Sequence, residues 1–238
     1  MSTKCKLFSL FFGIFFITES AWAAKELPNK FFLQYQLYQA GLNTGKVIII
    51  FSQKQNKYYL RTSISTGGIL KLFGDKEIKS DGIINSKGFV PNNFEAKNFR
   101  NPKKNILVAF DRQNKKIIIN YKNNLSEKKY TIEPIDLASL LLQFNFEKNK
   151  KRYDFNVVTG KKIKEFKYKK LKNEIIRIGS KSFTVEAYEG NIVNKKNSTH
   201  FIWLSKSLYR IPIKIRIKTK LGFLVDAVLV KTSLSLKH

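Results

Sequence analysis

The sequence predicts a mainly β protein, built as a strongly curved antiparallel sheet or an incomplete barrel with one central apolar helix. Apolar and polar residues alternate through most of the 238-residue chain, and one apolar segment breaks that alternation. Successive side chains of a strand point to opposite faces, so the alternation indicates half-buried strands. Residues 210–218 show it best, and we expect an inner apolar face and an outer cationic face there. The inner residues are Ile211, Ile213, Ile215 and Ile217, and the outer residues are Lys214, Arg216 and Lys218.

The first residues have the composition of a secretory signal peptide. Lys4 and Lys6 precede an apolar run at residues 7–17, and residues 21–23 (Ala-Trp-Ala) form a small-x-small cleavage site. The run is too short to span a bilayer as a mature helix. A retained anchor helix is the alternative interpretation, and the polar residues 18–20 argue against it.

This interpretation divides the chain into a signal peptide and a single domain. We expect residues 1–23 to be removed and residues 24–238 to form a single β-rich domain in the periplasm of a Gram-negative cell. Cys5, the only cysteine, lies in the removed part. The exported chain is therefore expected to be stabilised by its core without disulfides.

The first half of this domain is predicted to be an antiparallel meander. Gly, Asn and Ser mark the turns, and Pro91 is expected to end one strand. The expected strands are residues 31–38, 46–51, 58–64, 76–84, 93–99, 106–111 and 117–121.

Residues 67–74 interrupt this rhythm. Four apolar side chains cluster there between glycines, around Lys71. The segment is either one helical turn that closes the sheet or an exposed apolar lip, and the structural role is the favoured one. The four side chains are Ile69, Leu70, Leu72 and Phe73.

Residues 134–144 predict the one helix. Pro134 suits the first helical position, and Asp136 would place a negative charge at the positive end of the helix dipole. Asp136, Ser139 and Gln143 form a narrow polar stripe, and the remaining positions are apolar. Such a helix requires burial on most sides. We therefore expect it to pack against or plug the concave face of the sheet.

The second half returns to strands after a basic hinge at residues 148–152. Turns are expected near Gly160 and at residues 189–191, and a further turn at residues 220–222 leads into the last strand. The expected strands are residues 153–158, 163–170, 174–178, 182–188, 199–204, 210–218 and 223–230.

The chain is strongly basic, with a formal net charge of +28. Such a field attracts polyanions and anionic lipid surfaces. The other interpretation is a genome rich in A and T, which would load a solvated surface with Lys without any function. If the charge is functional, the residues expected to bind an anionic surface are Lys161, Lys162, Lys164, Lys167, Lys169, Lys214, Arg216 and Lys218.

The residue types do not favour catalysis. His200 and His238 are the only histidines, and His200 is expected to be exposed at the start of a strand. A metal site or a nucleophilic triad would have to be built around it, and the spacing suggests neither. Acidic residues at 75, 77 and 81 are expected to be solvated rather than paired as in a glycosidase. We expect no enzyme activity, no cofactor, no metal and no nucleic-acid partner.

Five stretches, in order, resemble a bacterial exported family called domain of unknown function 3108. They are residues 35–46, 66–73, 80–91, 134–143 and 201–213. Each is weak alone, but together they cover nearly all of the exported chain. The resemblance implies an all-antiparallel, strongly curved sheet or incomplete barrel in the periplasm, and it implies no catalytic residues. The Lys-rich run at residues 161–172 departs from the pattern of that family.

The sequence favours a non-enzymatic periplasmic protein that binds an apolar or amphiphilic ligand or supports envelope maintenance. Curved antiparallel sheets of this size can hold a ligand at the mouth. The alternative is a structural or interaction protein with a filled core, which docks on anionic lipid or lipopolysaccharide through its Lys-rich face. The residues expected to line the ligand site are Ile69, Leu70, Leu72, Phe73, Leu137, Leu141 and Trp203.

Overall fold

The computed structural model describes residues 27–146, 150–195, 198–218 and 222–236, with the side chain of Ile69 left out. The predicted signal peptide, residues 1–23, lies outside the described residues, as does most of the predicted turn at residues 220–222. The elements in chain order are β1 (Lys30–Gln39), β2 (Leu42–Lys54), β3 (Lys57–Thr66), η1 (Gly68–Phe73), β4 (Lys76–Asn85), β5 (Gly88–Asn98), η2 (Pro102–Lys104), β6 (Ile106–Asp111), β7 (Lys116–Tyr121), β8 (Asn124–Lys129), β9 (Ile135–Asp136), α1 (Leu140–Gln143), β10 (Arg152–Val158), β11 (Ile163–Ile178), β12 (Lys181–Ile192), β13 (His200–Ser205), β14 (Pro212–Lys218) and β15 (Leu224–Thr232).

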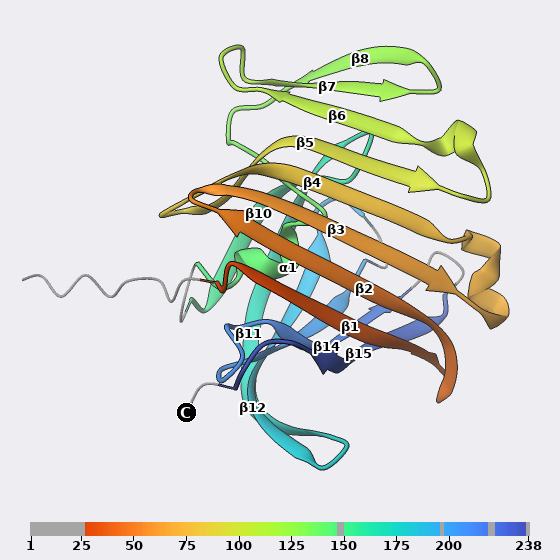
Figure 1. The fold of residues 1–238 in the computed structure, drawn as a ribbon, viewed down its shortest axis with the longest axis vertical. Coiled ribbons are helices and arrows are strands. Elements are labelled where there is room, and N and C mark those ends of the chain that lie inside the picture. Colours follow the sequence, from red (N-terminus) through yellow and green to blue (C-terminus); the bar gives the residue numbers. More distant parts are fainter. Residues whose placement is uncertain (1–26, 147–149, 196–197, 219–221, 237–238) are drawn as a thin grey trace, which may run out of the picture.

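All strands belong to one sheet, which curves back on itself (Figure 1). Its order is β8-β7-β6-β5-β4-β3-β2-β1-β15-β14-β13-β12-β11-β10-β9, so the first and last strands of the chain are neighbours. We call β1–β8 the N-terminal wall and β10–β14 the C-terminal wall; β15 joins them. Within the described residues, β8 and β9 each pair on one side only, so the barrel is incomplete. The predicted mainly β, strongly curved sheet is confirmed.

One pair departs from the expected antiparallel pattern. β9 runs parallel to β10, with Ile135 opposite Val157 and Asp136 opposite Val158. A parallel pair needs a crossover connection. The segment that contains α1 supplies it, between the two walls (Figure 1).

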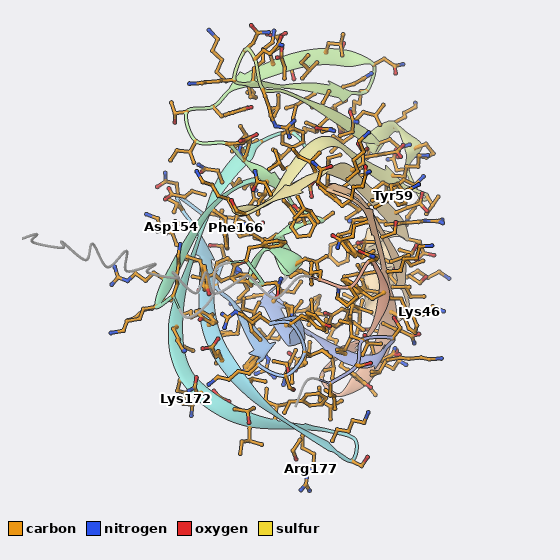
Figure 2. The ribbon with its side chains drawn as sticks, turned by 60° about the vertical axis from the view of Figure 1, so that its left-hand side comes forward. Lys46, Tyr59, Asp154, Phe166, Lys172 and Arg177 are labelled. Carbon is orange, nitrogen blue, oxygen red and sulfur yellow. The ribbon has the colours of Figure 1, made fainter. Side chains whose placement is uncertain are left out.

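The predicted alternation of burial holds along the N-terminal wall. In β1, Phe31, Leu33 and Tyr35 are buried, and in β3 Tyr58 and Leu60 are buried. Figure 2 shows Tyr59 and Lys46 on the outer side of the same wall. Apolar side chains from both walls fill the space between them, and the largest cluster extends from Leu33 in β1 to Ile213 in β14.

For residues 134–144, the predicted burial is largely confirmed, but the predicted length of the helix is wrong. Only Leu140–Gln143 is α-helical, because residues 135–136 form β9 and the Asp136 carboxylate accepts a hydrogen bond from the Ser139 N–H, 2.8 Å away. An aspartate that bonds the backbone locally competes with a helical turn. Leu142 and Phe144 are fully buried, whereas Leu137 is 38% exposed and not part of an apolar helical face.

Phe144 lies at the centre of an aromatic cluster from the C-terminal wall. Its ring meets those of Tyr153, Phe155 and Tyr168 edge-on, with centroids 5.1, 5.3 and 5.0 Å away. Such T-shaped pairs add to the free energy gained by burial. The segment therefore acts as a core plug, as the apolar pattern indicated.

Several predicted boundaries in the N-terminal wall change. Pro91 does not end a strand but lies inside β5, next to a register shift in the pairing with β4, which is where a sheet tolerates proline. β8 was not predicted, because all six of its residues are exposed and show no alternating burial. The expectation that Glu77 is solvated is wrong, because β4 pairs on both sides and Glu77 is 7% exposed, with Arg61 and Lys79 as its ion-pair partners.

Further changes lie in the C-terminal wall. Two predicted strands form one long β11 with an irregularity between Lys170 and Asn173. The expected turn at residues 189–191 is part of β12. A Cβ on Gly190 would lie 2.4 Å from His200 Nε2 and 2.5 Å from the Tyr168 ring, so this glycine permits close packing rather than a turn.

The inner row of residues 211–217 is only partly buried. Ile211 and Ile213 are fully buried and Ile215 is half-buried, but Ile217 is 44% exposed. The last residues of the strand extend beyond the packed interior. The apolar alternation in the sequence therefore continues where the side chains are no longer buried. No helix in the described residues has the length and hydropathy needed to cross a membrane.

Candidate functional site

The segment at residues 67–74 is a short 3-10 helix, η1, between β3 and β4. Leu70 points inward and packs with Leu37 and Val225, and Phe73 packs against the same small cluster. Leu72 is 60% exposed. The predicted helical turn is confirmed. The turn also carries an exposed apolar residue, so the two alternatives coexist in one element.

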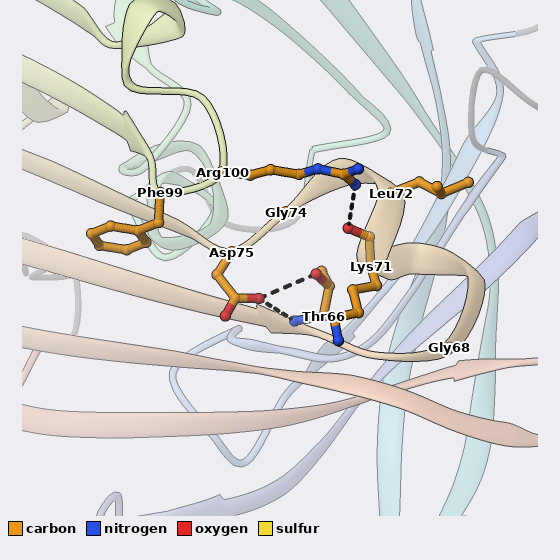
Figure 3. Close-up of a pocket in the computed structure, with 8 residues that line it drawn as sticks. All are labelled: Thr66, Gly68, Lys71, Leu72, Gly74, Asp75, Phe99 and Arg100. Carbon is orange, nitrogen blue, oxygen red and sulfur yellow. Dashed lines mark hydrogen bonds between the residues drawn. The ribbon is translucent and has the colours of Figure 1, made fainter.

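A cleft of about 610 Å³ opens to solvent beside η1 (Figure 3). Its two sides are η1 with the ends of β3 and β4, and the segment that follows β5. The residues that line it are Thr66, Gly68, Lys71, Leu72, Gly74, Asp75, Phe99 and Arg100.

Hydrogen bonds fix the two sides of this cleft relative to each other. Within the first side, Asp75 Oδ1 accepts from the Thr66 N–H at 2.8 Å and from its hydroxyl at 3.2 Å, and two further bonds join this side to the other. Arg100 Nη1 donates to the Lys71 carbonyl at 3.1 Å, as Figure 3 shows. The Phe99 N–H donates to the Asp75 carbonyl at 3.1 Å. The cleft is therefore preformed, as small-molecule sites usually are.

The lining of the cleft is amphiphilic. Leu72 and Phe99 are 60% and 61% exposed, which leaves two large apolar side chains in water. Figure 3 shows Phe99 and Leu72 at opposite ends of the cleft, with the exposed cations Lys71 and Arg100 between them. Asp75 is the acidic member, and the Thr66 hydrogen bonds occupy one of its oxygens. This arrangement can hold an acyl chain against Leu72 and Phe99 and an anionic headgroup near the two cations.

The residues expected to line an interior ligand site are not brought together. Leu70 is in the core, and Leu141 is a half-buried residue of the plug itself. Trp203 alternates with the buried Ile202 and Leu204, so its side chain lies on the opposite face of β13. Leu72 and Phe73 belong to η1, Leu137 follows β9, and the side chain of Ile69 is outside the described residues.

The expected cationic face is divided by acidic partners. Lys167 pairs with Glu165 at 3.0 Å, and Arg216 binds Asp226 through two hydrogen bonds of 2.6 and 2.7 Å. Lys214 Nζ lies 3.4 Å from the same carboxylate. On β11, Lys164 is half-buried, and Lys169 is exposed and lies opposite Glu189 of β12 in the strand register.

Besides Lys169, three of the expected cations are exposed outside the ion pairs of the described structure. Lys161 and Lys162 are exposed in the turn between β10 and β11, and Lys218 is exposed at the end of β14. Lys161 Nζ lies 3.3 Å from the centroid of the Tyr121 ring, a cation–π contact that joins this turn to the end of β7.

The sequence did not indicate a buried ion pair in the C-terminal wall. The Arg210 guanidinium contacts Glu186 and donates to the Phe144 carbonyl at 3.0 Å and the Tyr153 hydroxyl at 2.9 Å. Lys170 also contacts Glu186. Arg210 is 7% exposed and Glu186 1%. The pair anchors the plug to β12, and we assign it a structural role.

A second buried polar chain lies against the N-terminal wall. The Tyr58 hydroxyl bonds Ser80 Oγ at 2.8 Å, and Ser80 Oγ donates to the Asp136 carboxylate. Asp136 is fully buried, and burial raises its pKa from 3.8 to about 6. The hydrogen bond between Ser80 and Asp136 joins β4 to β9.

The expectation that His200 is exposed is wrong. It is 9% exposed, and its ring packs edge-on against those of Phe166 and Tyr168. Nδ1 lies 3.0 Å from the Ser198 carbonyl and Nε2 lies 3.0 Å from the Tyr168 hydroxyl. A carbonyl only accepts, so Nδ1 carries the proton and Nε2 accepts from Tyr168. Burial lowers the pKa of His200, and the described residues contain no cluster of three potential metal ligands.

Comparisons with known proteins place the fold and the family. No curated protein matches the sequence. The chain is similar in structure to a beta-barrel-like protein of the domain of unknown function DUF1849 from Brucella abortus, with a TM-score of 0.58 and 10% identity over 87% of this chain and 98% of that one. At this identity the likeness concerns the fold alone. The model of the family described as protein of unknown function (DUF3108) matches residues 34–229, and the chain therefore belongs to that family.

Proposed function

We propose that this protein is a non-enzymatic binding protein of the bacterial periplasm, and that it binds an anionic amphiphile in the cleft beside η1. The observation that carries the proposal is the pairing of Leu72 and Phe99, both more than half exposed, with Lys71 and Arg100 in one preformed cleft. The periplasmic location rests on the signal-like composition of residues 1–23.

The chemistry of the cleft supports an amphiphile over a purely polar ligand. Burying a Leu or Phe side chain fully gains about 1.5–3 kcal/mol, so an acyl chain that covers Leu72 and Phe99 gains a few kcal/mol before the costs of association. The two cations add selectivity for a headgroup with a negative charge. The cleft volume of about 610 Å³ lies within the range of small-molecule sites.

The cleft supports binding better than the interior does. The space between the walls is packed by Leu142, Phe144 and the side chains around them, which are fully buried. A ligand there would have to displace close-packed side chains. The proposed ligand therefore lies on the outside of the fold, at the ends of β3, β4 and β5, and not between the two walls.

The test is a titration with a fluorescent long-chain fatty acid, with its neutral methyl ester as the matched probe. We expect saturable binding of the acid. The ester should bind roughly tenfold more weakly, a difference of about 1.4 kcal/mol in binding free energy, because it lacks the charge that the two cations attract. The double variant Leu72→Ser/Phe99→Ser should weaken binding of both probes.

Ile50→Ser is the control, because Ile50 is 47% exposed on β2 and does not line the cleft. Amide NMR shifts should concentrate at Thr66, Gly74 and Asp75. Binding that survives the double variant, or shifts that appear only elsewhere, would refute the assignment of the ligand to this cleft.

A further inference from the structure

We infer that one rim of the sheet, formed by strand ends and their connections and including the η1 cleft, is a docking surface for an anionic lipid bilayer. This goes beyond the single-ligand cleft, because it uses residues that do not line the cleft and a partner that covers them at once. The edge contains the β1–β2 turn, η1, η2, the β7–β8 turn and the adjoining ends of β14 and β15, and we call it the lip rim. It is the right-hand edge of the N-terminal wall in Figure 1.

Contacts between distant segments place these elements together. Leu70 of η1 packs between Leu37 of β1 and Val225 of β15. Lys218 and Leu224 are cross-strand partners at the ends of β14 and β15. Arg100, just after β5, donates to η1. The antiparallel pairing of β5 with β6 and of β6 with β7 brings η2 and the β7–β8 turn to the same edge.

Four large apolar side chains stand out from this rim into water. Leu42 is 72% exposed, Leu72 60%, Phe99 61% and Leu224 55%. They come from four connections that are far apart in sequence. Neighbouring strands are about 4.8 Å apart and five spacings separate β15 from β5, so the four tips span roughly 24 Å along the rim. A single small ligand cannot cover them, whereas a bilayer surface can.

Exposed cations surround these tips. They are Lys46, Lys71, Arg100, Lys103, Lys104, Lys122 and Lys218. The carboxylates nearby are engaged within the protein, since Asp75 accepts from Thr66 and Asp226 binds Arg216. The long stems of Lys and Arg let their charges reach the headgroup level while apolar neighbours enter the acyl region.

The opposite rim of the same wall provides the contrast that favours a bilayer. Its turns end in polar residues: Gln55 and Asn56, Asn85 and Ser86, and Gln113 and Asn114, all exposed. Both rims carry lysines, but the lip rim combines them with apolar turn tips, whereas the exposed Ile132 of the opposite rim lies in the connection after β8 and not in a hairpin turn. That combination is typical of surfaces that lie in a membrane interface, where apolar insertion and attraction to anionic lipid act together.

The experiment measures co-sedimentation of the purified protein with vesicles of phosphatidylglycerol or of phosphatidylcholine, at low and high salt. We expect binding to phosphatidylglycerol that weakens steeply with salt, and much weaker binding to phosphatidylcholine. Every variant is compared in the same chain, so any contribution of residues 1–26 is common to all.

Two pairs of variants separate the lip rim from the rest. Leu42→Ser/Leu224→Ser should lower the vesicle partition coefficient roughly tenfold or more, from the lost burial of two leucines. Lys103→Glu/Lys104→Glu should lower it by at least roughly thirtyfold, since each lysine near an anionic surface contributes roughly fivefold and the new carboxylates are repelled by that surface. Lys54→Glu/Lys57→Glu and Ile132→Ser, at the opposite end of the wall, should change it little.

Tryptophan fluorescence reads the contact directly. Leu42→Trp should show a blue shift with phosphatidylglycerol vesicles, and Gln55→Trp should not. Equal losses from changes at the two ends, binding that ignores salt, or no blue shift at residue 42 would overturn the inference. The fatty-acid titration distinguishes this result from failure of the proposed function, because Leu42→Ser/Leu224→Ser leaves the cleft residues intact and should not alter binding of the soluble probe.

Discussion

The two walls of the sheet bury their polar groups in opposite ways. Against the N-terminal wall, the buried acid Asp136 has hydroxyl and amide partners, Ser80 and Ser139, and its pKa is raised to about 6 by burial. Against the C-terminal wall, the buried acid Glu186 contacts two cations, Arg210 and Lys170. One interior therefore favours a neutral carboxyl group, and the other depends on charges that compensate each other.

The same alternating sequence pattern therefore forms two interiors whose stabilities depend differently on pH and on buried charge. His200 extends the contrast, because burial in the C-terminal wall lowers its pKa. Desolvation acts on each group by disfavouring its charged form. The two walls should thus respond to acid in opposite directions, and substitutions in each can be compared directly.

The largest effect is expected from Glu186→Gln. The change leaves Arg210 and Lys170 without their shared counter-charge in a buried site, and removing one partner of a buried pair costs about 3–5 kcal/mol of unfolding free energy. Urea unfolding at neutral pH measures it. Glu95→Gln is the control: Glu95 pairs with Lys97 at 3.2 Å on the outer face and is partly exposed, so its loss should stay below about 1 kcal/mol. Similar losses for the two variants would contradict the distinction.

Asp136→Asn should reverse the usual sign of a core substitution. The folded pKa of Asp136 lies above the unfolded value, so the folded state binds this proton more tightly. Stability from the group is full below pH 3.8 and is lost as pH rises to about 6. The shift corresponds to an effect of the order of 3 kcal/mol above pH 6. Asn keeps an acceptor for Ser139 and can donate to Ser80.

The Asp136→Asn variant should therefore be as stable as the parent protein near pH 4 and more stable near pH 7. Unfolding midpoints measured across this range give the comparison. A variant that is less stable than the parent protein at pH 7, with an unchanged slope between pH 4 and 6, would show that the carboxyl group is not desolvated as described.

His200 should produce a smaller effect of the opposite direction. Its folded pKa lies below the unfolded value of 6.5, so its stability contribution is full above pH 6.5 and is lost as pH falls through the folded pKa. We expect His200→Gln to remove this loss on acidification. Tyr168→Phe is the matched control, since it removes the hydrogen bond to Nε2 and keeps the titrating ring. The Asp136→Asn variant keeps His200 and has no titrating group at position 136. If the unfolding free energy of this variant rises on acidification below pH 6.5, this assignment fails.

The sequence allowed much of the fold to be predicted, because alternation reports the burial of each strand face. The buried rows at Tyr58 and Leu60 in β3 and at Ile211 and Ile213 beside β14 were predicted in this way. Alternation fails where burial is not periodic. β8 has no buried face, and Ile217 continues the pattern beyond the end of the core.

The remaining errors come from partners that are distant in sequence. The short α1 depends on Asp136, which bonds Ser139 locally and Ser80 from another strand, so its apolar periodicity alone was misleading. Gly190 suggested a turn, yet it makes room for rings from β11 and β13. In the cleft, the lip at Leu72 was evident from the sequence, but the side that carries Phe99 and Arg100 was not, because its contacts with η1 cross 29 positions of the chain.

The smallest effect is expected on the outer face of the C-terminal wall. Arg216 and Asp226 form a bidentate pair, but their side chains are 40% and 21% exposed. Arg216→Gln should therefore cost about 0.2–1 kcal/mol, and the loss should shrink at high salt because exposed charges are screened. Urea unfolding with and without added salt measures both features. A salt-independent loss as large as that of Glu186→Gln would mean that the position of a charge pair on the inner or outer face of this wall does not determine its contribution.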